Sequence, residues 1–173
     1  MLDRIISFVR VNREILLGKN ATLGTVSAAN VETTLNNANL VALKGLVTTE
    51  VVAATNAITA AESGSTFFLS SATEFVSTLP APALGLRYTF IVAAAPSGAS
   101  YTVVTTSSAN IIKGLQQSVA GDAGDFGTAD DTITFVDGQA LAGDRVDVIS
   151  DGTSWFAYAN SKVAAGITFT QAS

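Results

Sequence analysis

Aromatic residues are confined almost entirely to one part of this 173-residue chain. The sequence holds nine Phe, three Tyr and one Trp, and all of them except Phe8 lie at position 67 or later. Because aromatic side chains supply much of the bulk of a globular core, the core must come from the later two thirds of the chain. Residues 21–61 contain no aromatic residue and only three charged ones, so we expect them not to form a core of their own.

Short β-rich runs recur between turn-forming residues throughout the aromatic part of the chain. Such runs at close spacing are typical of strands in a sandwich or barrel. The sequence therefore predicts an all-β domain over residues 62–173, either an antiparallel, jelly-roll-like β-sandwich or a small barrel. Its expected strands cover residues 66–70, 74–79, 87–93, 100–106, 110–112, 132–136, 145–150, 153–159 and 166–170.

A tight hairpin at Asp151-Gly152 is the sharpest local prediction. This dipeptide suits the positive-φ positions of a two-residue turn. Such a turn would place Ser150 opposite Thr153 and Val148 opposite Trp155. The predicted register then assigns every residue of both strands to one of the two faces of the sheet.

Both faces of this predicted hairpin are apolar. The face opposite the core carries Ile149, Phe156 and Tyr158, which a sheet solvated on one side would not require. Two interpretations remain open, namely burial inside a two-layer domain and contact with another subunit. On the second interpretation, these three residues are candidate interface residues.

The N-terminal residues follow a helical period. Apolar side chains recur at spacings of three, four and seven, which predicts a short amphipathic helix over residues 2–17. This helix either packs on its own domain or a sister subunit, or inserts into a different protein. Residues 1–61 are thus predicted to be an arm in which the helix precedes an extended segment. The candidate interface residues of the helix are Ile5, Ile6, Val9 and Leu16.

Composition excludes several functional classes. The chain has no Cys and no His, which removes disulfides, thiolate nucleophiles and catalysis by imidazole. Charged residues make up 13% of the chain, about half the usual share. The net charge of −5 disfavours nucleic acid as a partner. No stretch of about 20 residues is apolar enough to cross a membrane. We therefore expect no enzymatic activity and no cofactor.

Acidic residues gather in a Gly-rich segment around positions 121–131. Short Asp side chains on such a turn can converge on Ca²⁺, but their spacing is not that of an EF-hand. The alternative is a solvated loop that keeps an otherwise apolar protein soluble. A glycosidase would need a pair of carboxylates, and nothing in the sequence selects one. The weak metal candidates are Asp122, Asp125, Asp130 and Asp131.

Three segments resemble a β domain found in small virion structural proteins and fibre-tip modules of tailed bacteriophages. They are residues 62–69 (ESGSTFFL), 77–92 (STLPAPALGLRYTFIV) and 143–156 (GDRVDVISDGTSWF). The resemblance covers roughly the last two thirds of the chain. It implies a homotrimer, because these proteins are commonly trimeric.

The resemblance and the scarcity of candidate catalytic residues together suggest a structural role in a virus particle. We expect a capsid decoration, or cement, protein that docks on the major capsid protein through residues 1–61 and lies on the outer surface of the virion. Strand addition at an exposed sheet edge would give such an arm backbone hydrogen bonds. The alternative is a tail fibre or receptor-binding tip that recognises a host-surface glycan.

Overall fold

The computed structural model describes residues 23–26, 32–35, 48–118 and 129–171. The chain divides into two compact units, Met1–Leu46 and Val47–Ser173. In the first unit, β1 (Leu23–Val26) and β2 (Glu32–Leu35) form an antiparallel hairpin with Leu23 opposite Leu35. The predicted N-terminal helix, with Ile5, Ile6, Val9 and Leu16, lies outside the described residues.

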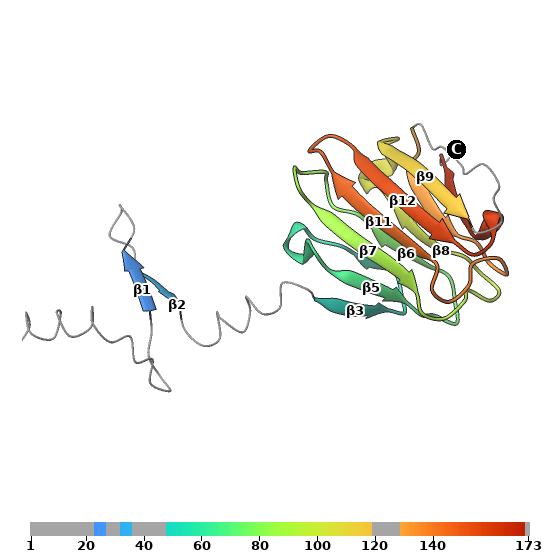
Figure 1. Ribbon diagram of the computed structural model, residues 1–173, viewed down its shortest axis with the longest axis horizontal. Coiled ribbons are helices and arrows are strands. Elements are labelled where there is room, and N and C mark those ends of the chain that lie inside the picture. Colours follow the sequence, from blue (N-terminus) through green and yellow to red (C-terminus); the bar gives the residue numbers. More distant parts are fainter. Residues whose placement is uncertain (1–22, 27–31, 36–47, 119–128, 172–173) are drawn as a thin grey trace, which may run out of the picture. The chain divides into compact units, whose positions relative to one another are not determined.

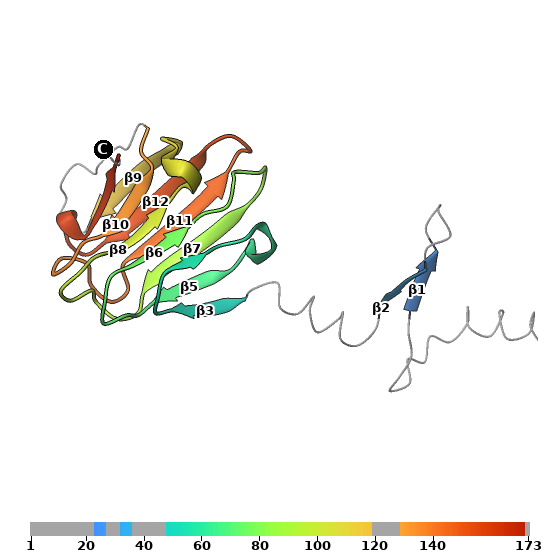
Figure 2. The same ribbon diagram turned by 180° about the vertical axis from the view of Figure 1, so that it is seen from behind.

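The described residues of the second unit form two sheets. One has six strands in the order β3-β5-β7-β11-β12-β9, and the other has five in the order β13-β10-β8-β6-β4. Figure 1 shows the six-stranded sheet in front, and Figure 2 shows the unit from behind. The strands are β3 (Thr49–Val52), β4 (Asn56–Ala57), β5 (Thr66–Leu69), β6 (Phe75–Thr78), β7 (Arg87–Val92), β8 (Tyr101–Val104), β9 (Ile112–Ser118), β10 (Thr132–Phe135), β11 (Arg145–Ser150), β12 (Trp155–Ser161) and β13 (Ile167–Thr170).

In the described part of the chain, three short 3₁₀ turns accompany these strands. The first, η1, holds Thr59 at its start, where the Glu62 carboxylate accepts hydrogen bonds from the Thr59 backbone N–H and hydroxyl. Tyr88 on β7 donates its hydroxyl proton to the Thr59 carbonyl at 2.9 Å, which fastens this turn to the sheet. The turns are η1 (Ala60–Glu62), η2 (Thr106–Ser108) and η3 (Ala164–Gly166).

One hydrophobic cluster joins the inward side chains of both sheets. Along β7, β10 and β12, buried residues alternate with more exposed ones, as the period of a strand requires. Aromatic rings fill the centre: Phe67 stacks on Phe90 with centroids 5.3 Å apart, and Tyr88 lies 5.8 Å from Trp155. The predicted all-β class is confirmed, and most of the core comes from the aromatic part of the chain.

The predicted purely antiparallel pairing is wrong, because both sheets are mixed. Strands β5 and β7 are parallel neighbours in one sheet, and β6 and β8 are parallel neighbours in the other. Strand β9 is also parallel to β12. From β3 to β10 the chain changes sheet at every strand, so same-sheet neighbours are separated by an excursion through the other sheet. The alternation of apolar and polar residues along a strand indicates which side chains point to each face of the sheet. It does not indicate whether the neighbouring strand is parallel or antiparallel.

The second unit begins at Val47, upstream of the predicted domain start at Glu62. Strand β3 pairs with β5 at the edge of the six-stranded sheet, and β4 pairs with β6 at the edge of the other. Edge strands need few core side chains. Here Val52 and Ile58 are buried, and these aliphatic residues attach a segment without aromatics to the core.

The β11–β12 hairpin differs from its predicted register by two residues. Ser150 lies opposite Trp155, not Thr153, and the loop has four residues. Asp151 builds this loop: its backbone N–H donates to the Ser154 carbonyl at 3.2 Å, and its side-chain oxygen accepts from the Ser154 N–H at 2.7 Å. Because a shift of two residues keeps each side chain on its face, the predicted division into two faces holds.

Gly114 on β9 leads to a prediction about packing between the two sheets. A Cβ atom at this position would lie 2.5 Å from the Phe169 ring of β13. We expect Gly114→Ala to lower the free energy of unfolding by roughly 1–3 kcal/mol, because the ring must move in a packed core. Urea denaturation measures this cost. In a Phe169→Leu background the smaller side chain should reduce the cost, and an equal cost in both backgrounds would contradict the proposed contact.

Asp151 should make stability depend on pH. Hydrogen bonds from the Ser154 and Thr153 backbone N–H groups hold the pKa of its carboxyl below the ordinary 3.8. A lowered folded-state pKa gives a contribution that is complete above the ordinary value and is lost as the pH falls towards the folded value. Asp151→Asn keeps an acceptor oxygen but cannot ionise. The thermal stability of wild type should therefore exceed that of the variant at about pH 6 and approach it below about pH 3; a difference independent of pH would contradict this.

Candidate interaction surface

The outer face of the six-stranded sheet carries exposed apolar side chains. Ile149 on β11 is 46% exposed and Tyr158 on β12 is 51% exposed, while Phe156 on β12 is half-buried. Leu115 on the neighbouring β9 is also exposed. The interpretation of burial inside a two-layer domain is therefore wrong for Ile149 and Tyr158. We call Leu115, Ile149, Phe156 and Tyr158 the outer patch.

Strand register brings the outer patch together. Ile149 lies directly opposite Phe156 in the antiparallel β11–β12 pair, and Tyr158 lies level with Leu115 in the parallel β12–β9 pair. Lys113 on β9 holds its ammonium group 5.1 Å from the centre of the Phe156 ring, within reach of a cation–π interaction. The sheet therefore joins the three interface candidates of the hairpin to a fourth apolar side chain from a distant segment.

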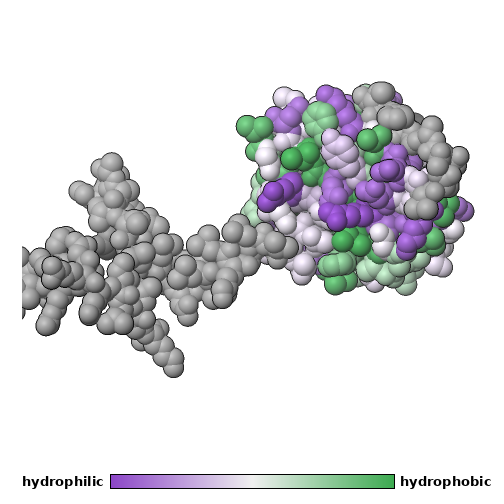
Figure 3. Space-filling view, in the orientation of Figure 1, coloured by the Kyte–Doolittle hydropathy of each residue, from purple (hydrophilic) through white to green (hydrophobic). Residues whose placement is uncertain are grey.

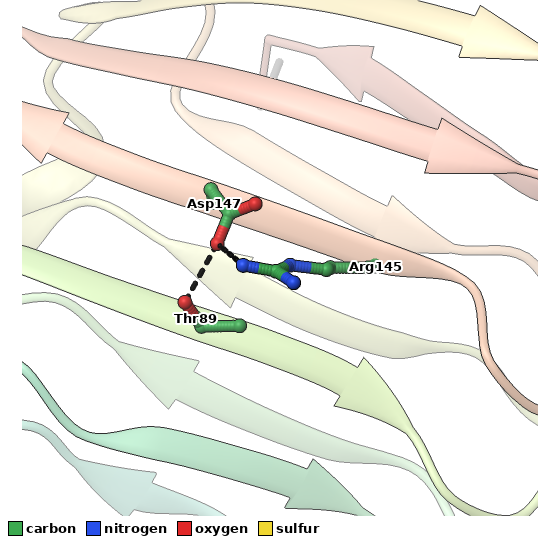
Figure 4. A network of polar contacts seen from close by, with 3 residues as sticks. All are labelled: Thr89, Arg145 and Asp147. Carbon is green, nitrogen blue, oxygen red and sulfur yellow. Dashed lines mark hydrogen bonds and ion pairs between the residues drawn. The ribbon is translucent and has the colours of Figure 1, made fainter. Parts of the chain in front are cut away.

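A polar network borders the outer patch on β7 and β11 (Figure 4). One carboxylate oxygen of Asp147 accepts hydrogen bonds from the Thr89 hydroxyl at 2.6 Å and from the Arg145 guanidinium at 2.7 Å. The bond to Asp147 raises the pKa of Arg145 above its ordinary value. Because this ion pair is exposed, its contribution to stability is only about 0–1 kcal/mol. This ion pair places charged groups beside the apolar residues of the outer patch.

Figure 3 shows this face with hydrophobic and hydrophilic residues intermingled. At the far edge of the same sheet, Val51 on β3 is 66% exposed. Its register neighbours Phe68 and Ile91 share its face and are half-buried. The apolar character of the outer face therefore extends beyond the outer patch, with polar residues between.

Two residues of this surface, Leu115 and Val51, escaped sequence reasoning. Leu115 lies in β9, whose sequence IKGLQQS contains Gly and two Gln and extends beyond the predicted strand over 110–112. The residues from Ile112 to Gln117 do not alternate between apolar and polar types, so the alternation of buried and exposed positions along β9 appears only in the structure. Val51 lies in β3, where Thr49, Glu50 and Val51 are exposed and Val52 is buried, within a segment predicted to be an arm.

The acidic candidates divide into two groups. Asp122 and Asp125 lie outside the described residues. Asp130 and Asp131 are buried, with 8% and 1% of their surface exposed. Asp131 accepts a hydrogen bond from the Thr132 hydroxyl at 2.6 Å, and the Asp130 backbone pairs with Ile112 at the start of β9. These two residues thus have structural contacts within the fold.

Within the described ranges, no group of three or more His, Cys, Asp or Glu side chains lies close enough together to hold a metal ion. The described part of the chain also contains no helix long and apolar enough to span a bilayer. No protein-family model matches the sequence, and comparisons with curated proteins and with solved structures give no match.

Proposed function

We propose that this chain is a non-enzymatic structural protein of a virus particle, a homotrimeric decoration protein held on the outer capsid surface by its N-terminal segment. The observation that carries the proposal is the outer patch. Exposed apolar side chains that adjoin one another on a regular sheet mark a surface for protein contact. The charged border of Arg145 and Asp147 resembles the polar rim that surrounds the apolar centre of an interface.

The two sheets support a rigid module suited to this role. We propose that they form a β-sandwich, since their inward side chains share one hydrophobic cluster. In such a module one face of each sheet is free for contact. A trimer would use the outer patch of one copy against a different surface of the next, in a ring closed by threefold symmetry.

The N-terminal hairpin supports docking on another protein. Among the described residues, strands β1 and β2 form a sheet of two strands. An isolated two-stranded hairpin is marginally stable in water and gains stability from further strands or a packed face. The major capsid protein would provide such a surface, and the apolar residues at positions 5, 6, 9 and 16 would add buried area to the contact.

The trimer can be tested in solution. Light scattering should give a mass three times the 17.7 kDa of the chain. Replacing both Ile149 and Tyr158 by Asp should shift the mass towards that of the monomer, because a charge buried without a partner is costly. Leu141→Asp is the matched control, since Leu141 is similarly exposed but lies in a loop. A monomeric wild type, or an intact trimer in the double variant, would overturn the assignment.

Docking can be tested on virus particles stripped of this protein. The full chain should rebind, and the triple variant Ile5→Asp, Ile6→Asp and Val9→Asp should bind at least tenfold less, because charges replace apolar contacts. Leu84→Asp, at an 84% exposed loop residue of the second unit, should bind as wild type does. Absence of the protein from purified particles by mass spectrometry would refute the proposal, as would unchanged binding of the triple variant.

A further inference from the structure

The chain contains two Asp-Gly dipeptides, Asp137-Gly138 after β10 and Asp151-Gly152 in the β11–β12 loop. In this dipeptide an aspartate rearranges more readily than before other residues. The backbone nitrogen of the glycine attacks the carboxyl carbon of the aspartate, and the missing side chain leaves that nitrogen accessible. Because the two dipeptides are chemically alike, a difference in reactivity between them must come from the fold around each.

The rearrangement has two steps. In the first, the glycine nitrogen bonds to Cγ of the protonated aspartate carboxyl, whose hydroxyl leaves with the nitrogen's proton as water, and a succinimide ring forms. In the second, water opens the ring. Addition at Cγ restores aspartate, whereas addition at the main-chain carbonyl carbon breaks the original peptide bond and gives isoaspartate. One water leaves and one is added, so the mass is unchanged and no oxidant or reductant takes part.

The fold holds both reacting groups of Asp151-Gly152. The Asp151 Oδ1 atom accepts hydrogen bonds from the Thr153 N–H at 2.8 Å, the Thr153 hydroxyl at 2.9 Å and the Ser154 N–H at 2.7 Å. The attacking group is also engaged, because the Gly152 N–H donates to the Ser150 hydroxyl at 3.1 Å. The bonds that lower the pKa of the Asp151 carboxyl keep it ionised, and the ionised form is the less reactive one.

Asp137-Gly138 is held by fewer contacts, and both of its residues are exposed. The Asp137 carboxylate accepts a single hydrogen bond within the described ranges, from the Gly98 N–H at 2.8 Å. The Gly138 N–H has no hydrogen-bond partner in the described part of the chain. A Cβ atom at Gly138 would have no heavy atom within 4 Å, whereas one at Gly152 would lie 3.4 Å from the Leu84 backbone. The attacking nitrogen of Gly138 is therefore unengaged and has space around it.

We infer that Asp137 is a site of spontaneous isoaspartate formation in the folded protein, and that the β11–β12 loop protects Asp151 from the same reaction. Ring closure at Asp137 releases one hydrogen bond of the carboxylate. At Asp151 it must release a carboxylate oxygen from three hydrogen bonds and the glycine nitrogen from another. These additional bonds should slow Asp151 by at least about tenfold relative to Asp137. The inference does not depend on the proposed place on a virus particle.

Conversion of Asp137 would alter a contact between two loops. Its carboxylate accepts from the Gly98 N–H, and its own backbone N–H donates to the Ser100 hydroxyl at 2.9 Å. Both partners lie in the loop before β8. In isoaspartate the main chain runs through the former side chain and is longer by one carbon, so the carboxylate and the N–H lose the spacing that reaches both partners. The converted protein should therefore melt at a lower temperature than the unconverted protein.

Incubation of the folded full chain for several weeks in water enriched in oxygen-18, at physiological pH and temperature, tests this inference. Trypsin then cleaves in ordinary water after Lys113, Arg145 and Lys162, so residues 114–145 and 146–162 carry one Asp-Gly dipeptide each. Ring opening leaves one oxygen-18 atom in the product, and electron-transfer fragmentation locates the isoaspartate. Isoaspartate should accumulate at residue 137 at least about tenfold faster than at residue 151.

Two controls separate the effect of the fold from that of the local sequence. In concentrated urea both dipeptides should convert at similar rates. In the folded Ser150→Ala variant, conversion should accelerate at Asp151, because the Gly152 N–H loses its acceptor, and should be unchanged at Asp137. Equal rates at Asp137 and Asp151 in the folded wild type would overturn the inference, since both would then react only in the unfolded chain. So would an unchanged rate at Asp151 in Ser150→Ala, or no oxygen-18 at Asp137 while the urea sample converts.

Discussion

The core between the two sheets is the constraint on which the rest of the second unit depends. From β3 to β10 each strand crosses to the other sheet, so most hydrogen-bonded neighbours are distant in the sequence. A single sheet cannot assemble by local hairpins under this connectivity. Both sheets must close together over the same aromatic side chains, and loop-closure entropy is lost before the pairings stabilise the fold. The rings of Phe67, Phe90 and Trp155 provide the burial that offsets this loss.

Local patterns in the sequence predicted the positions of the strands better than they predicted which strands pair with one another. The expected strand at 145–150 coincides with β11, and that at 66–70 differs from β5 by one residue. Direction and pairing depend on where the chain goes between strands, and β-branched runs carry no information about this. Strand β9 was predicted too short, because Gly114 is a poor strand former and the residues after Ile112 do not alternate between apolar and polar types. The places of Gly114 and Gln116 depend on tertiary contacts, with the Phe169 ring in one case and Ser161 in the other.

The candidate interface residues of the hairpin show which errors in the predicted strand register leave the predicted faces unchanged. The hairpin register was wrong by two residues because the Asp151 side chain closes a loop of four residues. An error of one residue would have turned Ile149, Phe156 and Tyr158 towards the core, whereas an error of two preserves their face. The place of Leu115 in the outer patch could not be predicted in this way, because its strand becomes a neighbour of the hairpin only through the nonlocal β9–β12 pair.

Strand β12 links the core and the outer patch. Its inward residues Trp155, Ala157 and Ala159 are buried in the core, while Phe156 and Tyr158 belong to the outer patch. Because successive side chains of a strand point to opposite faces, the outward residues can change without altering the packing of the inward ones. The outward residues Phe156 and Tyr158 thus form part of the outer patch, while the core depends on the inward residues of the same strand.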